Sequence, residues 1–204
     1  MLTVKAFIFD FGGVLYRNPE MHWMRRWQAR LGLQDDAMVN AFLDSPEENP
    51  YMVDVMLGKT SEDELYRIAA ERSHISPIII RYIRRKAFSK KRENTEVVRF
   101  MAELRPRFKT AILSNASDGA RILFTRTFGL DQHADTIIIS AEEGMAKPDE
   151  RIYQLALDRL GVRPEEVVFV DDRQVNVEAA QRLGLHAVQF CENQQALAEL
   201  RAYL

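Results

Sequence analysis

The stretch FIFDFGGVL, residues 7–15, ends an apolar run of strand length with a carboxylate and follows it with two glycines. A buried carboxylate is costly unless it is paired or lies at the open end of a strand. We therefore expect Asp10 to lie at the carboxyl edge of a sheet, where reactive groups of parallel α/β proteins gather. The pair Gly12-Gly13 is expected to serve the tight turn that leaves the strand.

The composition is that of a globular protein with one core, or a core and a small module: 204 residues, 47% apolar and 28% charged. A formal net charge of -2 gives no general attraction to nucleic acid or to an anionic membrane. No apolar run approaches the roughly 18 residues of a membrane span, and the N-terminus lacks a secretory signal pattern. The single cysteine, Cys191, allows no internal disulfide. We expect a cytoplasmic protein without nucleic-acid or membrane partners.

Short apolar runs alternate with helical patterns from about residue 107 onward, and the first run, 4–9, has the same character. Almost wholly apolar strands separated by helices predict an α/β fold, a Rossmann-like parallel sheet with helices on both faces. Several of the helical patterns end in glycine, which favours the left-handed residue after a helix. The expected later strands are residues 110–115, 136–140, 167–172 and 186–190.

Residues 17–90 differ from this alternating pattern, because their sequence is helical by pattern with few strand-like runs. Ser61-x-x-Glu64 is typical of a capping box, and Ser76-Pro77 of a helix start. We therefore predict a helical cap, residues 17–90, inserted into a core domain formed by residues 1–16 and 91–204.

Polar groups follow three of the predicted strands. Asp10, Ser114-Asn115 and Asp171-Asp172 end them, and Lys147 precedes a helix. Each alone has an ordinary explanation, such as a turn, a helix cap or a solvated lysine. Together they predict three carboxylates on one rim, which repel one another unless cations are present. An all-oxygen site of this kind suits Mg²⁺, and a carboxylate beside Mg²⁺, a lysine and a hydroxyl suits phosphoryl transfer.

Four ordered motifs carry a family resemblance: FDFGGVL, LSNAS, GMAKPDERIY and VVFVDDRQVN. In this order the chain resembles the haloacid dehalogenase (HAD) superfamily, in its helical-cap phosphatase branch. Bacterial receiver domains use similar groups, but there the acidic pair comes early and the lysine last. The resemblance implies a Mg²⁺-dependent phosphatase acting on a small phosphorylated metabolite, a sugar phosphate being favoured, with the cap setting specificity.

The resemblance also implies roles for the site residues. Asp10 is expected to be the nucleophile that forms a phospho-aspartyl intermediate. Ser114 and Asn115 are expected to bind the phosphoryl group, and Lys147 to steady both the nucleophile and the phosphate. The expected Mg²⁺ ligands are Asp10, the backbone carbonyl of Gly12, Asp171 and Asp172, with Asp172 the more direct of the last two.

Gly12 departs from the family pattern, because many of these phosphatases carry an aspartate there as general acid and base. Three interpretations stay open. Another group, such as Tyr16, Glu20 or His22, compensates in a phosphatase; the chain is a 2-haloacid dehalogenase, whose leaving halide needs no proton; or it is a catalytically weak binding or regulatory protein. The acidic pair argues for the metal-dependent phosphatase. The sequence leaves open whether the chain is a monomer or a homodimer.

A basic run, residues 81–86 with 90–92, lies near the predicted end of the cap. We expect a solvated helix face, with steering of an anionic substrate as the alternative.

Overall fold

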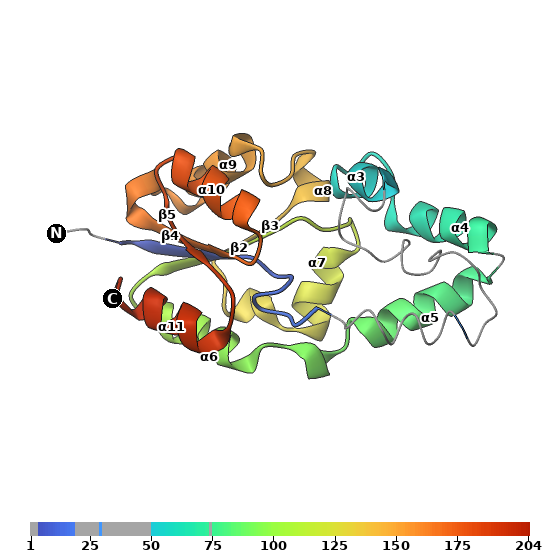
Figure 1. Ribbon diagram of the computed structural model, residues 1–204, viewed down its shortest axis with the longest axis horizontal. Coiled ribbons are helices and arrows are strands. Elements are labelled where there is room, and N and C mark those ends of the chain that lie inside the picture. Colours follow the sequence, from blue (N-terminus) through green and yellow to red (C-terminus); the bar gives the residue numbers. More distant parts are fainter. Residues whose placement is uncertain (1–3, 19–28, 30–49, 74) are drawn as a thin grey trace.

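The computed structural model describes residues 4–18, 29, 50–73 and 75–204. Its centre is a five-stranded parallel sheet with strand order β3-β2-β1-β4-β5 (Figure 1). This confirms the predicted fold class and the five expected strands. The strands are β1 Ala6–Phe9, β2 Lys109–Ser114, β3 Thr136–Ile139, β4 Val167–Asp171 and β5 His186–Gln189.

The central strand β1 is buried on both faces, as its uninterrupted apolar sequence predicts. It pairs with β2 on one side and β4 on the other. Phe9 is in register with Val170, so Asp10 and Asp171 leave the sheet at the same level. The chain fills one edge of the sheet with β2 and β3 and then crosses β1 to form β4 and β5. In open α/β sheets, ligands bind at this kind of switch point.

Helices cover both faces of the sheet (Figure 1). Helices α9 and α10 pack on the face that carries Ala6 and Ile8, while α6 and α11 pack on the face that carries Phe7 and Phe9. The core helices are α6 Thr95–Leu104, α7 Ala120–Ile122, α8 Ser140–Glu143, α9 Glu150–Leu160, α10 Gln174–Arg182 and α11 Asn193–Arg201.

Helix α9 follows local sequence signals at both ends, whereas the segment after α7 departs from regular α-helix. Helix α9 starts at an Asp149 cap, whose carboxylate accepts from the Arg151 N–H at 3.0 Å, and ends at left-handed Gly161. After α7 the chain forms a π-helix over Leu123–Thr127. There the Thr125 hydroxyl donates to the Arg121 carbonyl at 2.8 Å, so a side chain competes for the regular backbone acceptor.

Three further helices, α3 Pro50–Met56, α4 Glu62–Ser73 and α5 Pro77–Ala87, lie at the end of the molecule away from the termini (Figure 1). Ser61 accepts from the Glu64 N–H, the first half of the predicted capping box, and α5 starts at Pro77 as predicted. We call α3–α5 the helical insert; its division from the core as a separate domain stays a prediction. None of the helices among the described residues is long and apolar enough to cross a bilayer.

Candidate active site

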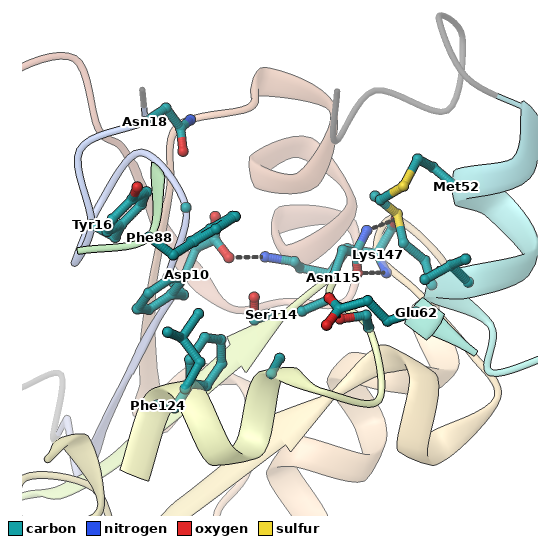
Figure 2. Close-up of a pocket in the computed structure, with 18 of the residues that line it drawn as sticks. Asp10, Tyr16, Asn18, Met52, Glu62, Phe88, Ser114, Asn115, Phe124 and Lys147 are labelled. Atoms are coloured by element: carbon teal, nitrogen blue, oxygen red, sulfur yellow. Dashed lines mark hydrogen bonds and ion pairs between the residues drawn. The ribbon is translucent and has the colours of Figure 1, made fainter. Parts of the chain in front are cut away.

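A buried ion-pair cluster lies at the carboxyl edge of the sheet, where β1, β2 and β4 end (Figure 2). The Lys147 Nζ donates to Asp10 Oδ1 at 2.7 Å, to Asp171 Oδ2 at 2.6 Å and to the Leu113 carbonyl at 2.9 Å. All three N–H bonds of the ammonium are therefore used, and its side chain is 1% exposed. A solvated lysine, the ordinary alternative for this position, is excluded.

Asp171 is committed to the protein at both carboxylate oxygens. While Oδ2 accepts from Lys147, Oδ1 accepts from the Arg173 N–H and from Asn176 Nδ2, both at 2.9 Å. Asp172 follows directly and lines the pocket. This difference supports the expectation that Asp172, rather than Asp171, is the more direct metal ligand.

Burial and neighbouring charges set the protonation of the cluster. Burial, assisted by Asp171, raises the pKa of Asp10 to about 7 although Lys147 opposes this. Burial also raises the pKa of Asp172, with the Asp171 charge adding to the effect. Burial alone would lower the pKa of Lys147, but the charges of Asp10 and Asp171 outweigh it and raise that pKa. The raised pKa values of Asp10 and Asp172 show that their charged forms lack full compensation from the single ammonium.

The residues present fit a divalent cation with oxygen ligands. Carboxylate oxygens of Asp10, Asp171 and Asp172 lie within 4.8 Å of one another. Asn176 Oδ1 is buried without a hydrogen-bond partner in the described structure, and its amide nitrogen already binds Asp171. Three carboxylates and an unsatisfied amide oxygen against one lysine ammonium suit Mg²⁺, which takes few protein ligands and retains water.

Two polar residues after β2 have different surroundings. Ser114 is buried and lines the pocket. Asn115 also lines it, but its side chain clamps the backbone of Lys147: Nδ2 donates to the Lys147 carbonyl and Oδ1 accepts from the Lys147 N–H, both at 2.8 Å. Asn115 therefore positions the lysine, and its predicted contact with phosphate stays a prediction.

The two glycines of the opening stretch differ. Gly13 has φ +78°, and a Cβ there would lie 2.1 Å from Asp172 Oδ2, so the turn and the acidic pair together require glycine. At Gly12 the nearest atom to an added Cβ, Asn18 Oδ1, is 3.5 Å away. Gly12 lines the pocket, and its backbone would accept a side chain, so packing does not explain the missing aspartate.

The described lining includes residues that the sequence did not single out. Arg173 and Asn176 follow the acidic pair, and their places after β4 were the available signal. Glu62 and Ser117 lie far apart in sequence, yet the Ser117 hydroxyl donates to Glu62 Oε1 at 2.6 Å. No local pattern could have joined them.

Of the three groups considered as replacements for the missing acid, Tyr16 is buried and lines the pocket, whereas Glu20 and His22 lie outside the described residues. Within the basic run, Arg81, Tyr82, Arg85 and Lys86 are exposed on α5, as expected for a solvated face. Cys191 is an exposed free thiol after β5.

Comparison with known proteins gives a match to the haloacid dehalogenase-like hydrolase family over residues 4–184. The chain is 29% identical over 211 residues to mouse "Acyl-CoA dehydrogenase family member 10" and 30% identical over 216 residues to pig "Bifunctional epoxide hydrolase 2". These matches cover 99% and 98% of the chain but only 19% and 38% of the two relatives.

Shorter matches fall on two kinds of enzyme. A "Phosphoserine phosphatase" of Thermus thermophilus is 32% identical over 131 residues, covering 62% of this chain and 53% of the relative. A "(S)-2-haloacid dehalogenase 4A" of Burkholderia cepacia is 38% identical over 78 residues, covering 38% of this chain and 34% of the relative.

Two solved structures share the fold along nearly their whole length. A "predicted HAD-like family hydrolase" of Porphyromonas gingivalis has a TM-score of 0.78 and 26% identity, with 98% of each chain covered. A HAD family enzyme of Bacteroides thetaiotaomicron, solved with magnesium and inorganic phosphate, has a TM-score of 0.76 and 20% identity, with 95% of this chain and 98% of that chain covered. From the family match over residues 4–184, we conclude that the chain belongs to the haloacid dehalogenase-like hydrolase family.

Proposed function

We propose that the protein is a Mg²⁺-dependent phosphatase that hydrolyses a small phosphate monoester through a phospho-aspartyl intermediate on Asp10. The observation that carries the proposal is the cluster of Asp10, Lys147 and Asp171 at the switch point of the sheet, with Ser114 and Asp172 lining the same pocket. A dehalogenase reaction does not use Mg²⁺, so the retained acidic pair favours phosphoryl transfer.

The chemistry would proceed in two displacements at phosphorus. Lys147 holds Oδ1 of Asp10, and we therefore assign the attack to Oδ2. The new bond from Oδ2 to phosphorus forms as the bond from phosphorus to the alcohol oxygen breaks, and the leaving oxygen takes a proton from solvent water, because Gly12 supplies none. Water then attacks phosphorus, the bond to Asp10 breaks, and inorganic phosphate and the free carboxylate are released.

The surrounding residues would bind and orient the phosphoryl group. The hydroxyl of Ser114, which lines the pocket, would donate to a phosphoryl oxygen, and the Lys147 ammonium would offset negative charge near the nucleophile. The ligands of Mg²⁺ would be Asp172, Asp10 and the Gly12 carbonyl, while Asp171, whose oxygens bind protein groups, would be a less direct ligand. When bound, the ion neutralises charge on the transferring group. The Bacteroides structure, which holds magnesium and inorganic phosphate, supports magnesium as the ion.

The helical insert would act as the cap, because Met52 and Glu62 reach from it into the pocket that contains Asp10 (Figure 2). The resemblance of the first motif, FDFGGVL, to one branch of the family favours a sugar phosphate as substrate. A partial relative, the "Phosphorylated carbohydrates phosphatase" of Thermotoga maritima, 32% identical over 82 residues, supports including sugar phosphates in any screen.

The test is hydrolysis of p-nitrophenyl phosphate and a panel of phosphate monoesters, with Mg²⁺ and with EDTA. We expect Mg²⁺-dependent release of phosphate from the wild type and loss of that activity in Asp10→Asn. Glu103→Gln, on α6 outside the pocket, is the control and should retain activity. Turnover of a 2-haloacid in EDTA would favour the dehalogenase instead. Full phosphatase activity in Asp10→Asn would refute the proposal.

A further inference from the structure

The chain leaves β1 through a turn that folds back over the active-site pocket. The Gly13 N–H donates to the Tyr16 carbonyl at 2.8 Å, and the Tyr16 N–H donates to the Phe11 carbonyl at 2.9 Å. From outside the turn, Asn94 Nδ2 donates to the Val14 carbonyl at 2.9 Å. The turn is therefore held both by its own backbone and by the core.

Asn18 follows this turn and lines the pocket that contains Asp10. Figure 2 shows the two residues on the same side of that pocket. The backbone of Asn18 is held by the core segment beside it, because the Arg17 N–H donates to the Arg92 carbonyl at 2.8 Å and Arg92 Nη1 donates to the Asn18 carbonyl at 3.4 Å. The fold therefore returns a polar side chain to the edge of the site where β1 ends.

The amide oxygen of Asn18 borders the space into which a side chain at position 12 would project. A Cβ on Gly12 would lie 3.5 Å from Asn18 Oδ1. Gly12, Asn18 and Asp10 line one cavity of about 140 Å³, so a water bound to Asn18 lies beside a small ester bound at Asp10. A bound water needs two to four polar partners. The Asn18 amide and the alcohol oxygen of the ester supply two of them.

Other polar residues of this pocket have hydrogen bonds to the protein. All three N–H bonds of the Lys147 ammonium are used, and both ends of the Asn115 amide bond to the Lys147 backbone. The Tyr16 ring is buried in an aromatic stack. In the described part of the chain, by contrast, no hydrogen bond joins the Asn18 side-chain amide to another residue. The amide oxygen of Asn18 can therefore accept from a water.

We propose that Asn18 Oδ1 holds the water that protonates the leaving oxygen, in place of an acidic side chain at position 12. The inference rests on the proposed phosphatase function and names where its proton donor is bound. An asparagine amide accepts and donates hydrogen bonds but does not supply a proton, so Asn18 is a positioning residue and the water is the acid.

The protons balance over the two displacements. As the bond from phosphorus to the alcohol oxygen breaks, one O–H bond of the water breaks and its proton joins that oxygen. The hydroxide that remains attacks phosphorus in the phospho-aspartyl intermediate, and the bond to Asp10 breaks. One ester and one water thus give one alcohol and one hydrogen phosphate, and the Asp10 carboxylate is restored.

The test is how kcat/KM depends on the leaving group in Asn18→Ala. The esters are p-nitrophenyl, phenyl and ethyl phosphate, whose leaving groups are increasingly basic. We expect kcat/KM to fall about tenfold for ethyl phosphate, as the loss of one hydrogen bond predicts, less for phenyl phosphate, and less than about twofold for p-nitrophenyl phosphate. Gln132→Ala, which removes an exposed amide outside the pocket, is the control and should leave all three values unchanged.

A rescue experiment tests whether the two positions share one space. Gly12→Asp places a carboxyl group beside the position that Asn18 occupies. In the Asn18→Ala background it should return kcat/KM for ethyl phosphate at least to the wild-type value, because the new side chain supplies the proton without the held water. A double variant that hydrolyses p-nitrophenyl phosphate normally but remains as slow as Asn18→Ala on ethyl phosphate would overturn the inference.

The outcomes separate the two proposals. An equal loss on all three esters in Asn18→Ala, or no loss on ethyl phosphate, would overturn the role of Asn18. Mg²⁺-dependent hydrolysis that is lost in Asp10→Asn upholds the phosphatase proposal, whatever Asn18→Ala does. Absence of Mg²⁺-dependent hydrolysis of any ester by the wild type would refute the phosphatase function itself.

Discussion

Replacing Lys147 by methionine tests the buried cluster by removing the ammonium while keeping an unbranched side chain of similar length. The wild-type ammonium contacts two carboxylates at 2.7 and 2.6 Å and is 1% exposed. Removing one partner of a buried ion pair costs about 3–5 kcal/mol, because the remaining charge is left buried and uncompensated. We expect Lys147→Met to lose about this much unfolding free energy at pH 8 in EDTA.

The loss should depend on pH. Burial already raises the pKa of Asp10 to about 7 with Lys147 in place, and without the ammonium that pKa rises further. A carboxyl group whose folded-state pKa is raised binds protons on folding, so the unfolding free energy of the variant increases as the pH falls from 8 towards 5. The penalty relative to wild type should therefore shrink over this range.

The assay is urea denaturation at pH 8 and pH 5, in EDTA and in Mg²⁺. Lys5→Met is the control, because the Lys5–Glu166 pair at 2.7 Å has a lysine side chain that is 55% exposed. Exposed pairs contribute about 0–1 kcal/mol. A loss in Lys147→Met no larger than in Lys5→Met, or a penalty that grows on acidification, would refute the reasoning. Mg²⁺ should restore part of the stability of Lys147→Met, since it supplies positive charge to the same carboxylates.

Three other predictions concern single sites. Gly12→Asp, with no neighbour closer than 3.5 Å to its Cβ, should raise kcat on an alkyl phosphate tenfold or more, since a general acid contributes about 10²–10⁴-fold. The kcat on p-nitrophenyl phosphate, whose leaving group needs no proton, should change little, and an equal change on both esters would contradict the assignment. Gly13→Ala forces a Cβ to within 2.1 Å of Asp172 Oδ2 at φ +78°. We therefore expect the free energy of unfolding in urea to fall by at least about 1–2 kcal/mol, and Mg²⁺ binding to weaken by calorimetry. Gly12→Ala, the control, should show neither effect. Glu166→Gln should lower the free energy of unfolding at pH 7, because the Arg163 backbone N–H lowers the folded-state pKa of Glu166 to about 2. The stabilisation by the Glu166 carboxylate is complete above its ordinary pKa and is lost as the pH falls towards 2. A difference in unfolding free energy from wild type that stays constant between pH 7 and pH 3 would argue against this.

Much of the fold and the centre of the site could be predicted because each signal is local. A short, wholly apolar run such as AFIF that is soon followed by two glycines favours a buried strand, and in a parallel sheet the residue after such a strand falls on the rim. This reasoning predicts that Asp10, Ser114 and Asp171 lie together on one rim, as the structure shows. The role of Lys147 as a counter-charge followed from the same argument, since clustered carboxylates need a cation nearby, but its complete burial is a finding of the structure.

Other features depend on contacts between distant segments and left no such signal. The clamp that Asn115 forms on Lys147 is one of them: both ends of its amide are bonded to the Lys147 backbone, 32 positions along the chain. Glu62 reads locally as part of a helix start, and only the packing of the insert on the loop after β2 brings it to Ser117. The π-helix after α7, where the Thr125 hydroxyl bonds the Arg121 carbonyl, likewise has no hydrophobic period that reveals it.

The most direct test of the central claim is to look for the phosphoryl group on Asp10. The wild type is mixed with excess p-nitrophenyl phosphate and Mg²⁺, quenched with acid within one turnover, and digested for mass spectrometry. The mechanism predicts a phosphoryl group on the peptide that contains Asp10, and none in Asp10→Asn or in EDTA. Rapid phosphate release with no phosphoryl group on Asp10, and undiminished in Asp10→Asn, would contradict the account.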